Sequence, residues 1–453
     1  MASLVQAPGS RLANFFAFRR DPLEFMVRMS NVGDLVALSS ARTAPSFVVN
    51  DPECVQELLV AKERHLRKGR SSRILAETLG SGLLTTEGQQ HATQRKLVQP
   101  AFHMQQIARQ AQAIVALAQS AVHDWLQDSP DRAVVRPLSE DLMELTLRVI
   151  TASMFGDAID ERAGQLGAAV DVCIRHSARR LYAPVPLSLK VPTPAHRRFA
   201  RALTDLDRYL DECMDADRDN LDANRGATLL SLLLDLRTEA GASWLTREQV
   251  RDQLLTIFIA GHETTANALS WALYLLCLYP DVQEQWHEEL DAVLAGATPA
   301  FADVARLPLT QRIFQESLRL YPTAWMILRE AVEPVAIGGH EFAANSTFLI
   351  SPFAIHRSAQ WWDEPLAFRP ERFAGERFKG LPRYVYFPFG GGSRSCVGSQ
   401  FAQMEAVLIL AVLGQALRFE LPTPDARVEP EPSVSLRVSG GLKLRMVRRN
   451  RSL

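Results

Sequence analysis

The sequence has little net charge and few cysteines, and each of these two features argues against a class of protein. Its 453 residues contain 50 Lys and Arg against 51 Asp and Glu, a formal net charge of −1 at pH 7. A nucleic-acid binder normally carries a clear basic excess, so this near neutrality argues against that class. The five cysteines are an odd number in a long chain. They argue against a secreted disulfide scaffold and favour a reducing cytosol.

The N-terminal segment lacks a long apolar run. Pro8 and then three arginines interrupt it before it reaches the roughly 18 apolar residues that a membrane span needs. It also lacks the basic, apolar and small-residue order of a secretory signal. We therefore expect a soluble cytoplasmic protein whose N-terminal segment packs on the protein body. The alternative is an amphipathic membrane contact through Leu12, Phe15, Phe16 and Phe18.

The chain also lacks linkers, low-complexity segments and repeats of fixed period. Its length by itself would suggest about three domains. The pattern is instead mostly helical, with short strands from distant parts of the chain, and this predicts one interleaved domain over residues 1–453. In the N-terminal part we expect two short strands within 34–50, then a helix that has Pro52 in its first turn and is capped by Asn50 or Asp51. We expect helices over 104–295. A β-rich zone over 325–355 with a turn at Gly338-Gly339, a helix over 399–417 and a β-like tail should follow.

The best defined element is a helix over 247–279. Thr246 and Gln249 form a capping-box pair at its start, and Tyr279-Pro280 ends it. At 1.5 Å per residue such a helix is about 50 Å long, and its apolar composition requires burial. Polar residues in the middle of a buried helix need a reason. This middle reads Ala260-Gly261-His262-Glu263-Thr264-Thr265.

Cys396 lies in a glycine-rich loop, residues 389–398, between a strand-like segment and a helix. Backbone N–H groups at the start of a helix and the nearby Arg394 both favour the thiolate, which is the form that binds metals. The other four cysteines are expected to be small buried hydrophobic residues. A phosphate-binding loop does not fit, because Gly390-x-Gly392 lacks the later glycine of a dinucleotide fingerprint and the Gly-Lys-Ser/Thr ending of a nucleotide loop.

The loop resembles the haem-binding signature Phe-x-x-Gly-x-Arg-x-Cys-x-Gly of the cytochrome P450 superfamily. The matching residues are Phe389, Gly392, Arg394, Cys396 and Gly398. Three further motifs of that family precede the loop in the expected order. They are Ala260-Gly261-x-Glu263-Thr264-Thr265, Glu316-x-x-Arg319 and Pro370-Glu371-Arg372-Phe373. The resemblance implies a mainly α cytochrome P450 fold, a large helical body around haem with small β-sheets near the N-terminal and C-terminal parts. It also implies a single haem domain over 1–453 with no fused reductase.

The resemblance implies haem b as the cofactor, with Cys396 as the axial thiolate of its iron. Such a thiolate donates electron density that favours cleavage of the O–O bond. Phe389 would pack over the sulfur. Glu316, Arg319 and Arg372 would form a buried charge network that fixes the haem loop. This role is structural, and loss of one member would leave an uncompensated buried charge.

The resemblance also implies four donors for the two haem propionates. The family commonly has Trp-x-x-x-Arg where this chain has His91-x-x-x-Arg95, and histidine is an alternative donor in some soluble bacterial members. Arg394 and Arg329 would add further contacts. Four donors for two carboxylates are a chemically sensible count.

The resemblance implies that the long helix supplies the residues that face bound dioxygen. Ala260 and Gly261 lie four and three residues before Thr264, so all three lie on one face. The missing side chain at Gly261 would let that face approach a flat cofactor, while the Thr264 hydroxyl would face dioxygen. Glu263 points about 100° away, which suits a proton relay from solvent. The alternative is that Thr264-Thr265 merely bond back to helix carbonyls.

The resemblance implies a soluble bacterial-type haem-thiolate monooxygenase, which inserts one atom of dioxygen into a C–H or C=C bond and reduces the other to water. Electrons would come from NAD(P)H through a separate ferredoxin or flavodoxin with its reductase, docking on the Cys396 side of a monomer. Fatty acids, terpenoids, steroids and polyketide-like molecules all fit an uncharged pocket. The candidate pocket residues are Phe258, Ile259, Ala260, Ala324, Trp325, Met326 and Ile327.

Two other function classes stay open. One is a peroxide-driven or isomerising haem-thiolate enzyme, although such members usually lose the acid and alcohol kept here as Glu263-Thr264. The other is a non-catalytic haem or gas sensor, although a sensor needs no proton relay and usually carries an output domain. Steady reductant-dependent product formation would separate these classes.

Overall fold

The computed structural model describes residues 1–39, 45–127, 133–156, 163–183, 185–219, 228–235 and 245–449. Within these ranges, no helix is both long and apolar enough to cross a membrane. The chain divides into two compact units, each assembled from segments that are far apart in the sequence. The first unit comprises Met1–Arg73, Gln315–Cys396 and Pro430–Leu436, and the second comprises Ile74–Phe314, Val397–Glu429 and Arg437–Leu453.

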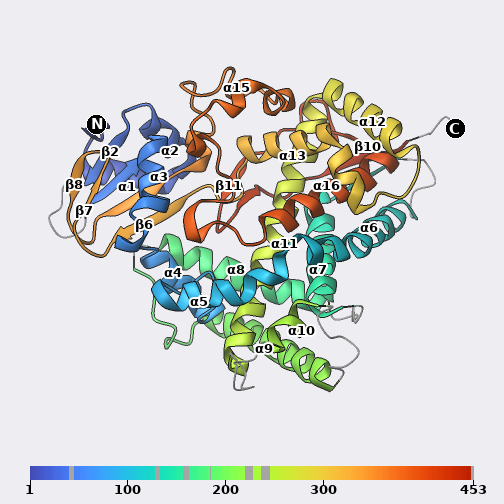
Figure 1. Ribbon diagram of the computed structural model, residues 1–453, viewed down its shortest axis with the longest axis horizontal. Helices are drawn as coiled ribbons and strands as arrows, with labels where there is room; N and C mark the ends of the chain where they lie inside the picture. The colour runs from blue at the N-terminus through green and yellow to red at the C-terminus, as the bar shows by residue number, and fades with distance from the viewer. Residues whose placement is uncertain are drawn as a thin grey trace. The chain divides into compact units, whose positions relative to one another are not determined.

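The first unit contains a six-stranded sheet. Its strands are β1 (Leu4–Gln6), β2 (Leu35–Ser39), β3 (Ser46–Val49), β4 (Leu66–Arg67), β6 (Ile327–Ala331) and β9 (Thr347–Ile350). In the order β1-β2-β3-β9-β6-β4, strands from both ends of the chain share one sheet, which joins blue and orange segments in Figure 1. The pairs β1–β2 and β3–β9 are parallel, and the other pairs are antiparallel. The strands expected within 34–50 and 325–355 are confirmed.

Apolar side chains cover both faces of this sheet. Phe47 and Val49 of β3 belong to one core cluster, whereas Val48 between them belongs to another. This alternation follows from the period of two in a strand. A separate hairpin joins β7 (Val335–Ile337) to β8 (His340–Phe342). Its turn is Gly338-Gly339, with φ angles of 58° and 85° that glycine adopts without strain, as the sequence predicts.

Short helices complete the first unit. They are α1 (Arg11–Arg20), α2 (Pro22–Ser30), α3 (Pro52–Gln56), α14 (Pro352–Ile355) and α15 (Glu376–Lys379), with a π-helical turn at Glu57–Ala61 and the short strand β11 (Pro430–Pro432). Asp51, rather than Asn50, caps α3, because its carboxylate accepts the Cys54 N–H across 2.8 Å. The division between the units falls within α4 (Arg70–Leu79), α13 (Pro308–Leu320) and β12 (Leu436–Val438).

The second unit is mostly helical. Its helices are α5 (Gly88–Val98), α6 (Met104–Gln127), α7 (Leu138–Phe155), α8 (Ala163–Tyr182), α9 (Pro194–Asp219), α10 (Leu229–Leu234), α11 (Arg247–Leu278), α12 (Pro280–Leu294) and α16 (Ser399–Ala416). A three-stranded antiparallel sheet has the order β10 (Leu417–Glu420), β13 (Leu444–Arg448) and β5 (Ala133–Arg136). Among the described residues of 104–295, the expected helical pattern is confirmed apart from the non-helical stretch 185–193 and from β5, a strand that the pattern missed.

Helix α11 begins and ends where the sequence predicts. The Thr246 hydroxyl accepts the Gln249 N–H, and the Gln249 side chain accepts the Thr246 N–H in return. Tyr279 closes the helix, and Pro280 opens α12 at once. Most residues of α11 are buried, and α7 packs along it within the same unit. The mainly α fold class with small sheets is confirmed.

Candidate active site

Cys396 ends a tight loop in the first unit. The Cys396 N–H donates to the carbonyl of Phe389, and the Gly390 N–H donates to the carbonyl of Phe387, both across 2.9 Å. A single 3-10 turn over Gly392–Arg394 lies between these two bonds. The preceding Phe387 is buried, whereas Cys396 is exposed. The loop therefore turns the chain out of the core and presents the thiol at its surface.

Two glycines let this loop pack closely on its neighbours. Gly392 has a φ of 68°, and a Cβ atom there would overlap the carbonyl oxygen of Leu59 in the π-helical turn. A Cβ atom at Gly391 would overlap the ring of Tyr384. Side chains at either position would push the loop away from the core. The motif predicted the first of these glycines, but its backbone contact is visible only in the fold.

The other cysteines have different surroundings. Cys54 and Cys173 are buried, and Cys213 and Cys277 are half-buried. Burial raises the pKa of the Cys173 thiol to about 12. Burial also raises the pKa of the Cys54 and Cys277 thiols far above the usual range. These three thiols are held in the protonated form, which does not bind metals. The exposed thiol on the loop is the suitable ligand.

Glu316, Arg319 and Arg372 meet in a buried ion-pair network, as their motifs predict. Arg319 donates from Nε and Nη2 to the two Glu316 oxygens across 2.7 and 2.8 Å, and both side chains are 0% exposed. Arg372 Nε donates to Glu316 Oε1 across 2.9 Å. The Arg319 guanidinium also donates to the backbone carbonyls of His356, Pro365 and Ala367. The buried charges are thus paired and hydrogen-bonded, which their burial requires.

The segment after α13 supplies four of the candidate pocket residues. Ala324 is exposed, and Met326 and Ile327 are half-buried. Trp325 is 2% exposed, and its Nε1 donates to the carbonyl of Ser433 across 3.0 Å. The prediction for Trp325 is therefore corrected, because a side chain so enclosed is a core residue of the first unit.

Two arginines predicted to bind propionates lie in the first unit. Arg329 in β6 is 7% exposed, and its Nη1 donates to the carbonyl of Leu328 across 2.8 Å. Arg394 ends the 3-10 turn and is half-buried. A Cβ atom at Gly390 would lie 3.9 Å from Ile327 Cδ1, so β6 runs beside the glycine loop. Both cations are therefore next to the loop that carries the thiol.

His91 and Arg95 lie one turn apart on α5 in the second unit. His91 is 4% exposed, and Arg95 is half-buried. The adjacent Gln94 donates from Nε2 to the carbonyl of Ser81 and accepts the hydroxyl of Thr86, both across 2.7 Å. These bonds fix α5 to the loop before it. The pair thus lies on one face of a helix whose rotation is set by a neighbouring side chain.

The middle of α11 exposes part of an otherwise buried helix. Ala260 is exposed, and Thr264, one turn later, is half-buried. A Cβ atom at Gly261 would lie 2.9 Å from Ile150 Cδ1 in α7. The prediction that Gly261 lets the helix approach a flat cofactor is therefore corrected, because its missing side chain makes room for α7. The open face of α11 is formed by Ala260 and Thr264.

Both threonine hydroxyls bond back to helix carbonyls. Thr264 Oγ1 donates to the Ala260 carbonyl across 2.8 Å, and Thr265 Oγ1 donates to the Gly261 carbonyl across 3.1 Å. Thr265 also lies 3.2 Å from Glu405 Oε2 of α16. Burial raises the pKa of Glu405 to about 8, so this carboxyl is neutral at pH 7. Sequence reasoning missed Glu405, although a single acid inside the apolar α16 was a visible signal.

Glu263 is 3% exposed and does not face solvent directly, which corrects the simple relay expected from its position. Arg437 Nε donates to Glu263 Oε1 across 2.6 Å, and Arg437 Nη1 lies 3.5 Å from Asp171 Oδ1 of α8. Asp171 in turn accepts from Arg175 across 2.6 Å. The side chains of these four residues become more exposed in this order, at 4%, 14%, 43% and 61%. Charged groups therefore connect Glu263 to the surface.

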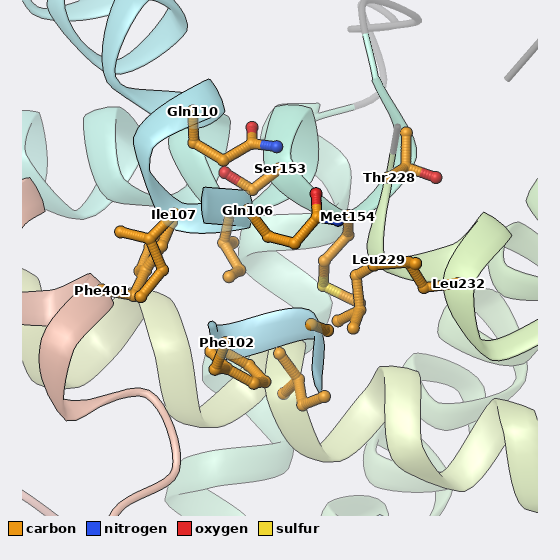
Figure 2. A pocket seen from close by; sticks show the side chains of 13 residues that line it. Phe102, Gln106, Ile107, Gln110, Ser153, Met154, Thr228, Leu229, Leu232 and Phe401 are labelled. Atoms are coloured by element: carbon orange, nitrogen blue, oxygen red, sulfur yellow. The ribbon is translucent and has the colours of Figure 1, made fainter. Parts of the chain in front are cut away.

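The second unit contains a cavity of about 40 Å³ beside α11 (Figure 2). Its lining residues are Ala101, Phe102, Gln106, Ile107, Gln110, Ile150, Ser153, Met154, Thr228, Leu229, Leu232, Ile257 and Phe401. Gln106, Gln110 and Ser153 cluster on one side of it in Figure 2. None of the candidate pocket residues lines this cavity. Phe258 is 1% exposed, which corrects its assignment from pocket to core, whereas the next residue, Ile259, is half-buried.

The donor set fits a haem with one protein thiolate. Among the residues that the structure describes, no three His, Cys, Asp or Glu side chains cluster as a metal site would require. A structural zinc site takes four protein ligands, whereas a haem iron takes its in-plane ligands from the porphyrin and needs one axial side chain. The exposed Cys396 provides that ligand type. Arg329 and Arg394 of the first unit, and His91 and Arg95 of the second, are residue types that can bind carboxylates such as propionates.

The cysteine loop suits a haem-thiolate protein, and the comparisons identify the family. The sequence profile described as Cytochrome P450 matches residues 6–445, so the chain belongs to the cytochrome P450 family. The crystal structure of the cytochrome P450DA haem domain matches with a TM-score of 0.88 at 25% identity, covering 99% of this chain and 98% of that one. The protein is a monooxygenase with a cysteine-ligated haem, which uses dioxygen and electrons delivered by redox partners.

Three similar proteins come from Streptomyces. Cyclooctatin synthase of Streptomyces melanosporofaciens is 35% identical, covering 94% of this chain and 91% of that protein. Cyclooctat-9-en-7-ol 5-monooxygenase of the same organism is 34% identical, covering 92% and 90%. Pentalenene oxygenase of Streptomyces avermitilis is 31% identical, covering 98% and 97%. These relatives agree with a monooxygenase that hydroxylates or epoxidises apolar small molecules.

Proposed function

We propose that this protein is a terpenoid monooxygenase in which Cys396 is the axial ligand of haem b. The observation that carries the proposal is the exposed Cys396 thiol at the end of a loop fixed by close glycine contacts. The names of the relatives support the substrate class, since they refer to pentalenene and to the alcohol cyclooctat-9-en-7-ol. The accessible candidate pocket residues are uncharged, which suits such molecules. They are Ile259, Ala260, Ala324, Met326 and Ile327.

Each side chain of the proposed site has a definite task. When bound, haem would supply oxygen activation, and the Cys396 sulfur would hold its iron. Arg329, Arg394, His91 and Arg95 would hold the propionates. The Thr264 hydroxyl, which donates to the Ala260 carbonyl, would redirect that hydrogen toward the open face of α11. Glu263, whose ion pair with Arg437 leads toward Asp171, would be the carboxylate that resupplies its proton. Glu316, Arg319 and Arg372 keep the loop in place.

The proposal extends to the partners of the enzyme. We infer a single haem domain, monomeric and cytoplasmic, that takes electrons from a ferredoxin or flavodoxin with its NAD(P)H-dependent reductase. The match of 99% of this chain to the P450DA haem domain supports one haem domain over residues 1–453. The odd number of cysteines, spread far apart in the chain, supports a reducing compartment.

The ligand assignment is tested by the absorption spectrum of the reduced protein with carbon monoxide. We expect the Soret band at the red-shifted position of a thiolate-ligated haem. Cys396→Ser should abolish that band, whereas Cys213→Ser, at a half-buried cysteine outside the loop, should keep it. If the wild-type protein lacks the shifted band, the assignment of Cys396 is wrong.

The substrate class is tested by binding spectra with matched panels of terpene hydrocarbons, terpene alcohols, fatty acids, steroids and macrolactones. We expect terpenoids to give the strongest spectral shift and to yield oxygenated product only with reductant, ferredoxin and reductase present. A preference for fatty acids or steroids would contradict the terpenoid assignment. Efficient product formation from hydrogen peroxide alone would favour the peroxide-driven class instead.

A further inference from the structure

His356 is a fully buried histidine of the first unit that belongs to none of the recognised motifs. It follows α14, and its side chain is 0% exposed. Its carbonyl oxygen accepts from Arg319 Nη1 across 2.8 Å, and its Nε2 accepts the backbone N–H of Phe387 across 3.0 Å. Its ring packs on Tyr386 and Phe387, with centroid distances of 5.3 Å to each. One residue thus contacts the buried ion-pair network and the segment that enters the cysteine loop.

The hydrogen bond to Phe387 defines the protonation state of His356. A backbone N–H can only donate, so Nε2 must be the unprotonated nitrogen of a neutral ring. Burial, helped by the charges of Arg319 and Arg357, lowers the pKa of His356 to about 3, so the ring stays neutral at physiological pH. A side chain without an acceptor at this position would leave a buried N–H unpaired, which is costly.

The position of Phe387 matters because the loop hydrogen bonds begin there. The Phe387 carbonyl accepts the Gly390 N–H, and the Phe389 carbonyl accepts the Cys396 N–H. We propose that His356 is a positioning residue that transmits the rigidity of the ion-pair network to Cys396 by holding the Phe387 amide. This inference rests on the proposed role of Cys396 as the axial ligand.

A second side chain anchors the same segment and offers a matched control. Tyr386 Oη donates to the carbonyl of Gln315 across 3.0 Å, one residue before the amide that His356 holds. Tyr386→Phe removes that bond and leaves the His356 bond to Phe387 in place. If any lost anchor loosens the segment, His356→Leu and Tyr386→Phe should have the same effect. If the Phe387 amide bond is what matters, only His356→Leu should have an effect.

The test compares His356→Gln, whose amide oxygen can accept the Phe387 N–H, with His356→Leu, which has no acceptor. In haem-loaded protein under mild denaturant, we expect His356→Leu to lose the thiolate Soret band on the order of tenfold faster than wild type. Amide exchange in residues 386–397 should accelerate by a similar factor. His356→Gln and Tyr386→Phe should stay near wild type in both measurements. Equal behaviour of the Leu and Gln variants would overturn the proposal.

A measurement on the unmodified protein covers the case in which His356→Leu fails to fold. In the diamagnetic reduced carbon monoxide complex with labelled histidine, the nitrogen resonance of His356 Nε2 should be that of an unprotonated nitrogen. It should not change as the pH falls through the usual histidine pKa of about 6.5. A protonated Nε2 would refute the role of His356. Absence of the thiolate band in wild type would instead refute Cys396 as ligand, and amide exchange would still report on His356.

Discussion

Arg437 Nε and Glu263 Oε1 lie 2.6 Å apart in an ion pair whose side chains are 14% and 4% exposed. Asp171 lies 3.5 Å from the same guanidinium and is 43% exposed. One arginine thus has a buried carboxylate on one side and a surface carboxylate on the other. The buried charge of α11 is compensated by a residue that lies far along the chain.

Arg437→Leu should destabilise the protein by about 3–5 kcal/mol, because it leaves Glu263 buried without its cationic partner. Arg437→Leu combined with Glu263→Leu should recover most of that loss. The measurement is urea unfolding of the haem-loaded protein. Arg175→Leu is the control, and it should cost less than about 1 kcal/mol because its pair with Asp171 is exposed. If Arg437→Leu and Arg175→Leu lower the free energy of unfolding equally, the buried pair stabilises the protein no more than the exposed pair does.

Thr264→Ala should uncouple the enzyme, because it removes the hydroxyl on the open face of α11. Reductant consumption should continue, while product per reductant falls at least on the order of tenfold and peroxide accumulates. Thr265→Val is the matched neighbour. It removes the contact with Glu405, and we expect a stability loss of about 1 kcal/mol without uncoupling. Unchanged coupling in Thr264→Ala would remove Thr264 from the proposed mechanism.

The stability of the protein should fall as the pH rises from about 5 to about 8, through the titration of Glu405. Burial raises its pKa from 4.5 to about 8 in the folded state. Between these values the folded protein holds a proton that the unfolded chain has lost, so unfolding is favoured at higher pH, by up to about 1.4 kcal/mol per pH unit. Glu405→Gln should lose this slope. Urea unfolding across the pH range measures it, and an identical slope in the variant would contradict the assignment.

Gly392→Ala should prevent stable haem binding, whereas Gly390→Ala should not. The two glycines have similar φ angles of 68° and 72°, so each alanine costs about 1–2 kcal/mol of backbone strain. Only Gly392 faces a backbone carbonyl, that of Leu59, which cannot rotate away. A Cβ at Gly390 meets only Ile327 Cδ1, at 3.9 Å. The ratio of Soret to protein absorbance reports the outcome, and equal ratios in the two variants would contradict the steric argument.

Local chemistry explains which elements could be predicted. The capping box of Thr246 and Gln249 and the break at Pro280 act within a few residues, so the expected helix over 247–279 agrees with α11 to within one residue. Strand β5 escaped prediction, because its four residues carry no clear alternation and pair with β13, about three hundred residues later. Gly261 was expected to face the cofactor but faces Ile150 of α7. The spacing of residues places Gly261 on one face of the helix but does not identify what packs against that face.

The sequence by itself determined the chemical groups of this protein and their order, from the Thr264 hydroxyl to the Cys396 thiol. Each of these motifs is a short run whose spacing can be read directly. Only the tertiary structure decided which groups are partners, including Glu263 with Arg437, 174 residues apart, and Thr265 with Glu405, 140 residues apart. Pairs so distant leave no periodicity in the chain, and their energetic weight depends on burial, which exists only once the chain has folded.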